Sequence, residues 1–212
     1  MDNNIIEFTN FLLNHNFSSD LVEKFKIYQS TLTERNKKIN LISKNSLDRI
    51  WSAHFLDSIL ICEEIDFSNK TVLDFGSGAG FPGIPIKILY PTMKICLIES
   101  VRKKALFLRY LLEKLELQNS EVLNIRFEDL GNQFINFFDI ILVRAVRMDK
   151  IYYEKCAQLL KQKGAVILYK GKSCETELEK IECAMFFKNV RKFQKRDSAL
   201  GTRNFIVIGK NG

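Results

Sequence analysis

Three glycines in the first half of the chain, Gly76, Gly78 and Gly80, follow a short apolar run with the spacing G-x-G-x-G. The run Val72–Phe75 has the length and composition of a buried strand, so the glycines form the turn after its carboxyl end. Glycine adopts positive φ angles and lacks the Cβ atom that would keep a ligand away. A helix is expected after the turn, and its free N–H groups favour electron-rich ligand atoms. The predicted cofactor-binding residues of this turn are Gly76, Ser77, Gly78, Gly80 and Phe81.

Two acidic residues flank the turn. The spacing differs from the dinucleotide fingerprint G-x-G-x-x-G, because the third glycine comes one residue earlier and Phe81-Pro82 follows it. The turn therefore fits an amino-acid or nucleoside moiety better than a pyrophosphate. Asp74 lies two residues before Gly76 and could reach a ligand amino group directly or through water. Glu99 ends the next strand-like run, where an acid can accept hydrogen bonds from both ribose hydroxyls.

Further polar residues follow the later strands. Phe127 and Glu128 come after the third strand, where an adenine ring would lie against an aromatic side chain and an acceptor for its amine. Arg144 closes the fourth strand within the apolar segment LVRAV. An arginine in such surroundings needs an anionic or polar partner. We expect Arg144, with Lys170 after the fifth strand, to handle the second substrate or its phosphate.

The elements that position these residues fall into two parts. Residues 1–68 have apolar positions at three- and four-residue steps and are expected to form a helical region, with one helix over Ser46–Glu64. From Thr71 short strands alternate with helices, the last of them over residues 175–187, which predicts right-handed crossovers and a parallel sheet. The final runs, NVRKFQKR and RNFIVIGK, are expected to pair as a hairpin.

This pattern predicts an α/β fold of the Rossmann-like class I S-adenosylmethionine-dependent methyltransferase type. It has a mostly parallel seven-stranded sheet over residues 69–212, a C-terminal β-hairpin and an N-terminal helical extension. S-adenosyl-L-methionine is then the expected cofactor.

The distribution of charge along the chain indicates what kind of partner the protein binds. The net charge of +7 divides into −2 for residues 1–70, 0 for 71–140, +3 for 141–187 and +6 for 188–212. Clustered cations of this kind favour a polyanionic partner, although a basic face that only confers solubility would give the same count. The residues expected to contact the phosphate backbone of such a partner are Arg102, Lys103, Lys104, Lys172, Arg191, Lys192, Lys195, Arg196 and Arg203.

Other compositional features exclude several classes of protein. The five cysteines are scattered and there are two histidines, so we expect neither a disulfide framework nor a metal site. The first residues lack the pattern of a signal peptide, and no apolar run approaches the ~20 residues of a membrane span. A cytoplasmic protein without a membrane partner is expected.

The combination of motifs resembles one family. GSGAGFPG, Glu99-Ser100, Arg144-Ala145 and Lys170-Gly171 are similar to segments of the bacterial RsmG (GidB) family, as are Asn40-Leu41 with Trp51, His54 and Asp57-Ser58 upstream and GTRNFIVIGK at the end. The resemblance covers residues 25–210 approximately. It implies an N7-guanine methyltransferase of 16S ribosomal RNA that acts on that RNA or on the small subunit.

The resemblance also implies a cofactor site at Gly76, Phe81, the Phe127-Glu128 pair and Arg144. Guanine N7 carries a lone pair and no proton, so no general base is expected. His54 and Asp57 lie three residues apart on a helix and would either fasten the helical region to the sheet or line the acceptor pocket.

Three alternatives stay open at the level of sequence. A nicotinamide-dependent oxidoreductase shares the fold class, although the glycine spacing disfavours it. An RNA-binding protein without catalysis and a methyltransferase of small molecules or proteins are the other two. The sequence is silent on oligomeric state, and a monomer is the default expectation.

Overall fold

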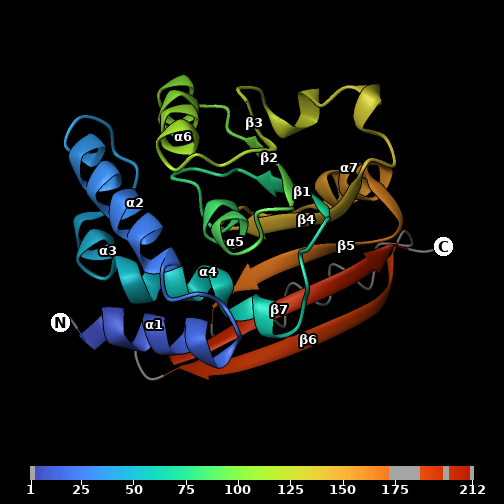
Figure 1. Cartoon of the computed structure of the whole chain (residues 1–212). Helices are drawn as coiled ribbons and strands as arrows, with labels where there is room; N and C mark the ends of the chain where they lie inside the picture. Colours follow the sequence, from blue (N-terminus) through green and yellow to red (C-terminus); the bar gives the residue numbers. More distant parts are fainter. Residues whose placement is uncertain (1–2, 172–186, 198–200, 211–212) are drawn as a thin grey trace.

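The computed structural model describes residues 3–171, 187–197 and 201–210. These residues form a seven-stranded sheet, and Figure 1 shows helices on both of its faces. The order across the sheet is β3-β2-β1-β4-β5-β7-β6. The strands are β1 (Thr71–Phe75), β2 (Lys94–Ile98), β3 (Ser120–Leu123), β4 (Phe138–Arg144), β5 (Leu160–Lys170), β6 (Phe187–Asp197) and β7 (Gly201–Lys210).

The strand directions confirm the predicted fold. β1 pairs in parallel with β2 and β4, β2 with β3, and β4 with β5. β7 is antiparallel to both β5 and β6, so the last two strands form the expected hairpin. The chain leaves β1 towards β2 on one side and later returns to β4 on the other. The carboxyl ends of β1 and β4 therefore flank the topological switch point at which open α/β sheets bind ligands.

Three α-helices lie in the connections between the parallel strands β1 to β5. They are α5 (Gly83–Leu89), α6 (Arg102–Lys114) and α7 (Lys150–Leu159). The helix expected over residues 175–187 falls almost wholly outside the described residues, and Phe187 begins β6. Within the described residues, no helix has the length and apolar character needed to cross a membrane.

The N-terminal helices pack on one face of the sheet. They are α1 (Asn3–Asn14), α2 (Leu21–Asn36), α3 (Lys44–Asp48) and α4 (Asp57–Ile59), with a π-helix at Trp51–Leu56 and a 3-10 turn at Leu60–Glu63. Phe8 contacts Phe25, Trp51 and Phe55 ring to ring, and this cluster is continuous with the apolar side of α5 and α6. Tyr28 adds a buried hydrogen bond from its hydroxyl to the Ala79 carbonyl, 2.6 Å long.

The segment predicted as one helix over Ser46–Glu64 is instead a series of short helical pieces. Its middle is wound as a π-helix, and Arg144 inserts beside it. The Arg144 guanidinium donates to the Ala53 carbonyl at 2.9 Å. Single π-turns within helices are rare and occur frequently at functional positions.

Candidate cofactor and acceptor sites

The turn after β1 requires glycine at two positions. Gly76 and Gly80 have φ angles of +74° and +101°. A Cβ atom on Gly76 would lie 2.9 Å from Val146 Cγ2, and one on Gly80 would lie 2.5 Å from the Tyr28 hydroxyl. The turn is thus wedged between the loop after β4 and the N-terminal helices, and larger residues do not fit.

Glu99 closes the turn from the end of β2. Its side chain accepts hydrogen bonds from the backbone N–H groups of Gly78 at 3.0 Å and Val101 at 2.7 Å. Glu99 is 6% exposed, yet it lines a cavity at the carboxyl edge of the sheet. A carboxylate has about four lone-pair sites, so two remain for the hydroxyls of a ribose.

This cavity, of about 190 Å³, is bounded by both aromatic and acidic side chains. Phe127 lies parallel to Phe75 at 3.8 Å between ring centroids. Tyr152, which the sequence analysis did not single out, packs edge-on against both rings. Its hydroxyl donates to Glu128 at 2.7 Å, and this bond lowers the pKa of the Glu128 carboxyl. The lining residues are Phe75, Gly76, Ile98, Glu99, Ser100, Ile125, Arg126, Phe127, Glu128 and Tyr152.

Asp74 is buried beneath the turn and lines neither this cavity nor the next. One carboxylate oxygen accepts from the Gly83 N–H at 3.2 Å. The other has no hydrogen-bond partner among the described residues. Burial raises the pKa of Asp74 to about 7. An unsatisfied buried acceptor favours an additional donor, which a ligand amino group or a water molecule would supply.

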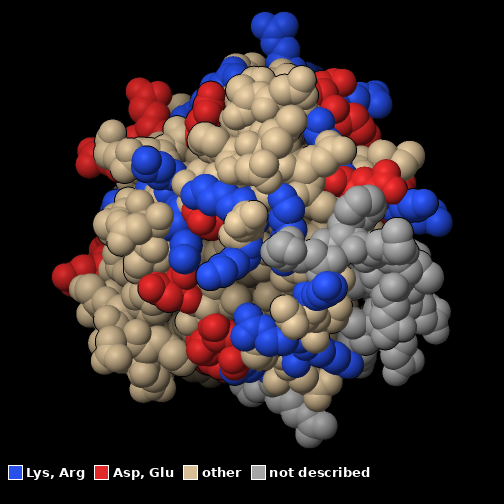
Figure 2. All heavy atoms as spheres, turned by 90° about the vertical axis from the view of Figure 1, so that its right-hand side faces the viewer, with Lys and Arg blue, Asp and Glu red and all other residues tan. Residues whose placement is uncertain are grey.

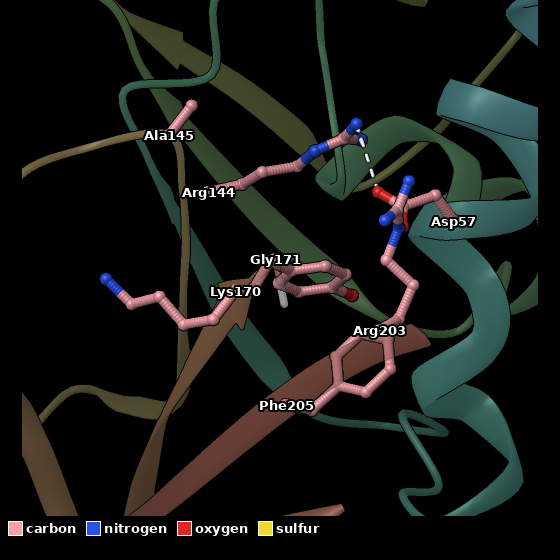
Figure 3. A pocket seen from close by; sticks show the side chains of 8 residues that line it. Asp57, Arg144, Ala145, Lys170, Gly171, Arg203 and Phe205 are labelled. Carbon is pink, nitrogen blue, oxygen red and sulfur yellow. Dashed lines mark hydrogen bonds and ion pairs between the residues drawn. The ribbon is translucent and has the colours of Figure 1, made fainter. Parts of the chain in front are cut away.

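Arg144 is the centre of a network that joins β4 to the N-terminal region. It forms an ion pair with Asp57 at 3.0 Å and donates to the Ser58 hydroxyl at 3.2 Å. Asp57 also accepts from Arg203 of β7 at 2.6 Å. Figure 3 shows both arginines converging on Asp57. Asp57 therefore fastens the helical region to two strands, which is one of the two roles considered for it from the sequence.

A second cavity, of about 360 Å³, opens beside this network. In Figure 3 the Lys170 side chain extends away from Asp57 and Arg203. The cavity is lined by cationic and aromatic side chains as well as Asp57: Asp57, Arg144, Ala145, Tyr169, Lys170, Gly171, Arg203 and Phe205. Because it lies at the carboxyl ends of β4 and β5, it is the candidate site for the acceptor.

His54 lies between the cofactor turn and the arginine. Its ring stacks on Phe81 at 4.6 Å, and Phe81 in turn stacks on Tyr28. Burial, with the nearby positive charge of Arg144, lowers the pKa of His54 to about 3. The imidazole is consequently neutral at physiological pH.

The residues predicted to contact RNA lie in different surroundings. Arg102 and Lys103 are exposed at the start of α6, Lys104 is half-buried beside them, and Arg191 and Lys192 are exposed on β6. Lys195 instead forms ion pairs with Glu63 at 2.6 Å and Glu64 at 2.7 Å. Arg203 is held by Asp57, as described above. Lys172 and the side chain of Arg196 lie outside the described residues.

The cavity with Glu99 fits the adenosine end of S-adenosylmethionine. Glu99 suits ribose hydroxyls and the aromatic wall suits the adenine. The unpartnered oxygen of Asp74 lies outside this cavity and would accept a hydrogen bond from the amino group directly or through water.

Comparison with known proteins agrees with this fit. The family model described as GidB, rRNA small subunit methyltransferase G, matches residues 21–206. A ribosomal RNA small subunit methyltransferase G from Mycoplasma capricolum is 37% identical over 204 residues, which cover 95% of this chain and 86% of the relative. One from Carboxydothermus hydrogenoformans is 36% identical over 196 residues, covering 89% and 83%.

Solved structures support the fold independently. The TrmI tRNA (m1A58) methyltransferase of Aquifex aeolicus has a TM-score of 0.57 at 22% identity, covering 74% of this chain and 68% of that one. TYW2 of M. jannaschii, crystallised in complex with AdoMet, has a TM-score of 0.57 at 14% identity, covering 80% and 76%. The family match spans most of the chain and confirms the resemblance seen in the sequence. The chain therefore belongs to the rRNA small subunit methyltransferase G family and is an S-adenosylmethionine-dependent rRNA methyltransferase.

Proposed function

We propose that the protein transfers a methyl group from S-adenosylmethionine to N7 of one guanine in 16S ribosomal RNA, without a general base. The observation that carries this proposal is the state of two side chains: Asp57, which lines the acceptor cavity, and His54, whose Nδ1 lies 3.4 Å from the Arg144 guanidinium. His54 has its pKa lowered to about 3, so it is a weak proton acceptor. Asp57 is held by two guanidinium groups. Such a site suits an acceptor that has no proton to lose.

Guanine N7 is an acceptor of that kind. Its in-plane lone pair forms the new bond to the methyl carbon while the bond from that carbon to sulfur breaks, and the electron pair of the broken bond goes to the sulfur. The positive charge passes to the guanine ring, and no proton moves. The bound cofactor supplies an electrophilic methyl group and a neutral leaving group. The protein's task is alignment and exclusion of water, which can supply roughly 7–11 kcal/mol.

The proposed roles of the residues follow their positions. Glu99 holds the ribose, the wall of Phe127 and Glu128 holds the adenine, and the turn with Asp74 holds the amino-acid end. Lys170 contacts the guanine or its phosphate. Arg144, whose guanidinium is bonded to the N-terminal region, sets the wall of the acceptor cavity and acts as a positioning residue.

The remaining proposals concern the surroundings of the enzyme. We propose that it acts as a monomer in the cytoplasm, on 16S rRNA either alone or in the small subunit. The family match and the net charge of +7 support an RNA partner.

A transfer assay tests the reaction. The protein is incubated with tritiated S-adenosylmethionine and small-subunit RNA from a strain that lacks the corresponding activity, and the RNA is digested to nucleosides. We expect the label to co-elute with 7-methylguanosine. Label in another nucleoside would overturn the proposed N7 specificity, and no transfer to small-subunit RNA or to the assembled subunit would overturn the activity.

A further inference from the structure

The N-terminal region covers only part of the sheet face on which it packs. Near the carboxyl end of β5, Asp57 bonds to Arg203, and Glu63 and Glu64 bond to Lys195. Towards the opposite end of the same strands, the face is uncovered in Figure 1, on the right-hand part of β5, β7 and β6. A hollow of about 650 Å³ lies there, which we call the hairpin hollow. It is lined by Lys163, Ala165, Asn189, Val190, Arg191, Val207, Gly209 and Lys210.

The strand register explains the shape of the hairpin hollow. Ala165 pairs with Gly209, and Val207 pairs with Arg191, so small and apolar residues form its floor. Directly paired residues project to the same face of a sheet. The Arg191 side chain consequently stands at the rim on the β6 side, where its guanidinium lies 5.4 Å from the centre of the Phe193 ring.

The charge of the hairpin hollow has one sign. Three of its lining residues are cations, Lys163, Arg191 and Lys210, and none is acidic. Lys163 and Arg191 are exposed, and within the described ranges neither forms an ion pair. Lys188 is a further exposed cation on the adjoining part of β6. Figure 2, which faces this end of the sheet, shows Lys and Arg side chains gathered near the centre with fewer Asp and Glu among them.

The cations at the other end of the hairpin differ from Lys163 and Arg191 because they have acidic partners. Lys195 and Arg203 are already neutralised by carboxylates of the same chain. Cations without such partners can release counterions from a phosphate backbone when they bind it. The small residues of the floor allow a backbone to approach closely.

We propose that the hairpin hollow, through Lys163 and Arg191, binds the phosphate backbone of the RNA substrate at a point remote from methyl transfer. This inference rests on the proposed rRNA substrate. Lys163 lies near the start of β5 and Lys170 ends it. The two are seven residues apart, about 23 Å at ~3.3 Å per residue. Each strand of a duplex carries one phosphate per ~3.4 Å of helix axis, so this distance corresponds to roughly seven phosphates along one strand. An RNA substrate that contacts both Lys163 and Lys170 must therefore be long enough to span this distance, or folded so that two of its segments reach the two residues.

Salt-dependent binding of 16S rRNA tests the proposal with the Lys163→Ala/Arg191→Ala variant. Each lost phosphate contact lowers the slope of log K against log salt by about 0.7–0.9, so the slope should fall by about 1.4–1.8. The KM for 16S rRNA should rise, with kcat and the affinity for S-adenosylhomocysteine unchanged. A matched control is Lys38→Ala/Lys114→Ala, which removes two exposed cations from the helical side of the molecule.

The outcomes separate this inference from the proposed function. If the wild-type protein binds and methylates 16S rRNA but the two double variants have the same slope, the hairpin hollow is not an RNA contact. If the wild-type protein itself fails to bind or methylate 16S rRNA, the proposed function fails first. A slope reduced only in Lys163→Ala/Arg191→Ala supports the inference.

Discussion

The carboxylate of Asp57 joins Arg144 and Arg203, at 3.0 Å and 2.6 Å, so one side chain of the helical region bonds to the ends of two strands of the sheet. Asp57 is 6% exposed. The acceptor cavity lies against this cluster. The geometry of the cavity thus depends on a contact between parts of the chain that are far apart in sequence.

Replacing Asp57 by alanine should both destabilise the protein and impair methyl transfer. The change leaves two guanidinium groups facing each other without their shared partner. Removal of one member of a buried ion pair destabilises by ~3–5 kcal/mol, and we expect the lower end because Arg203 is partly exposed. Urea unfolding measures the effect. A matched Asp66→Asn variant, on an exposed loop, should unfold like the wild type, and equal stability of Asp57→Ala would contradict the role of the cluster.

Glu99 should control affinity for the cofactor. Glu99→Ala removes the acceptor of the Gly78 and Val101 N–H groups as well as the proposed ribose contact. Hydrogen bonds to a charged group contribute ~1.5–3 kcal/mol each, so the Kd for S-adenosylhomocysteine should rise at least about ten-fold. Isothermal titration calorimetry measures this, with Glu113→Gln on the exposed side of α6 as the control. Unchanged affinity in Glu99→Ala would remove Glu99 from the site.

Asp74 should make stability depend on pH. Its folded pKa of about 7 lies above the ordinary value because burial disfavours the charged form. Its contribution to stability is therefore complete below about pH 4 and is lost as the pH rises to about 7. Asp74→Asn should be more stable than the wild type at pH 8, with the difference shrinking towards pH 5. A difference that is the same at both pH values, measured by thermal unfolding, would show that Asp74 does not titrate in this range.

Lys195 should matter for stability rather than for RNA binding. Its ion pairs with Glu63 and Glu64 are partly exposed, and such pairs contribute roughly 0.2–1 kcal/mol each. Lys195→Ala should lower Tm by a few degrees and leave the salt dependence of 16S rRNA binding close to that of the wild type. A slope reduced as much as in Lys163→Ala/Arg191→Ala would mean that Lys195 contacts RNA after all.

The sequence predicted the parts of the molecule that depend on local pattern. The strand and turn up to Gly80, the position of Glu99 and the C-terminal hairpin were all predictable, because periodicity and glycine spacing determine them. The ion pairs of Asp57 and Lys195 were not, since they join residues more than eighty positions apart and depend on how the helical region packs. The π-helix at Trp51–Leu56 also escaped prediction, and the Arg144 guanidinium that bonds to its Ala53 carbonyl comes from β4, far along the sequence. Tyr152 carried no motif and is positioned by the start of α7, where Asp149 accepts from its N–H.

Chemical mapping of the methylated position is the most direct test of the central proposal. Small-subunit RNA from a strain lacking the activity is methylated in vitro by this protein, then treated with borohydride and aniline, which cleave the chain at 7-methylguanosine. We predict one new cleavage, at a single guanine of 16S rRNA, that requires S-adenosylmethionine. Incorporation of the methyl group into 16S rRNA with no new cleavage would place it on another atom and contradict transfer to N7.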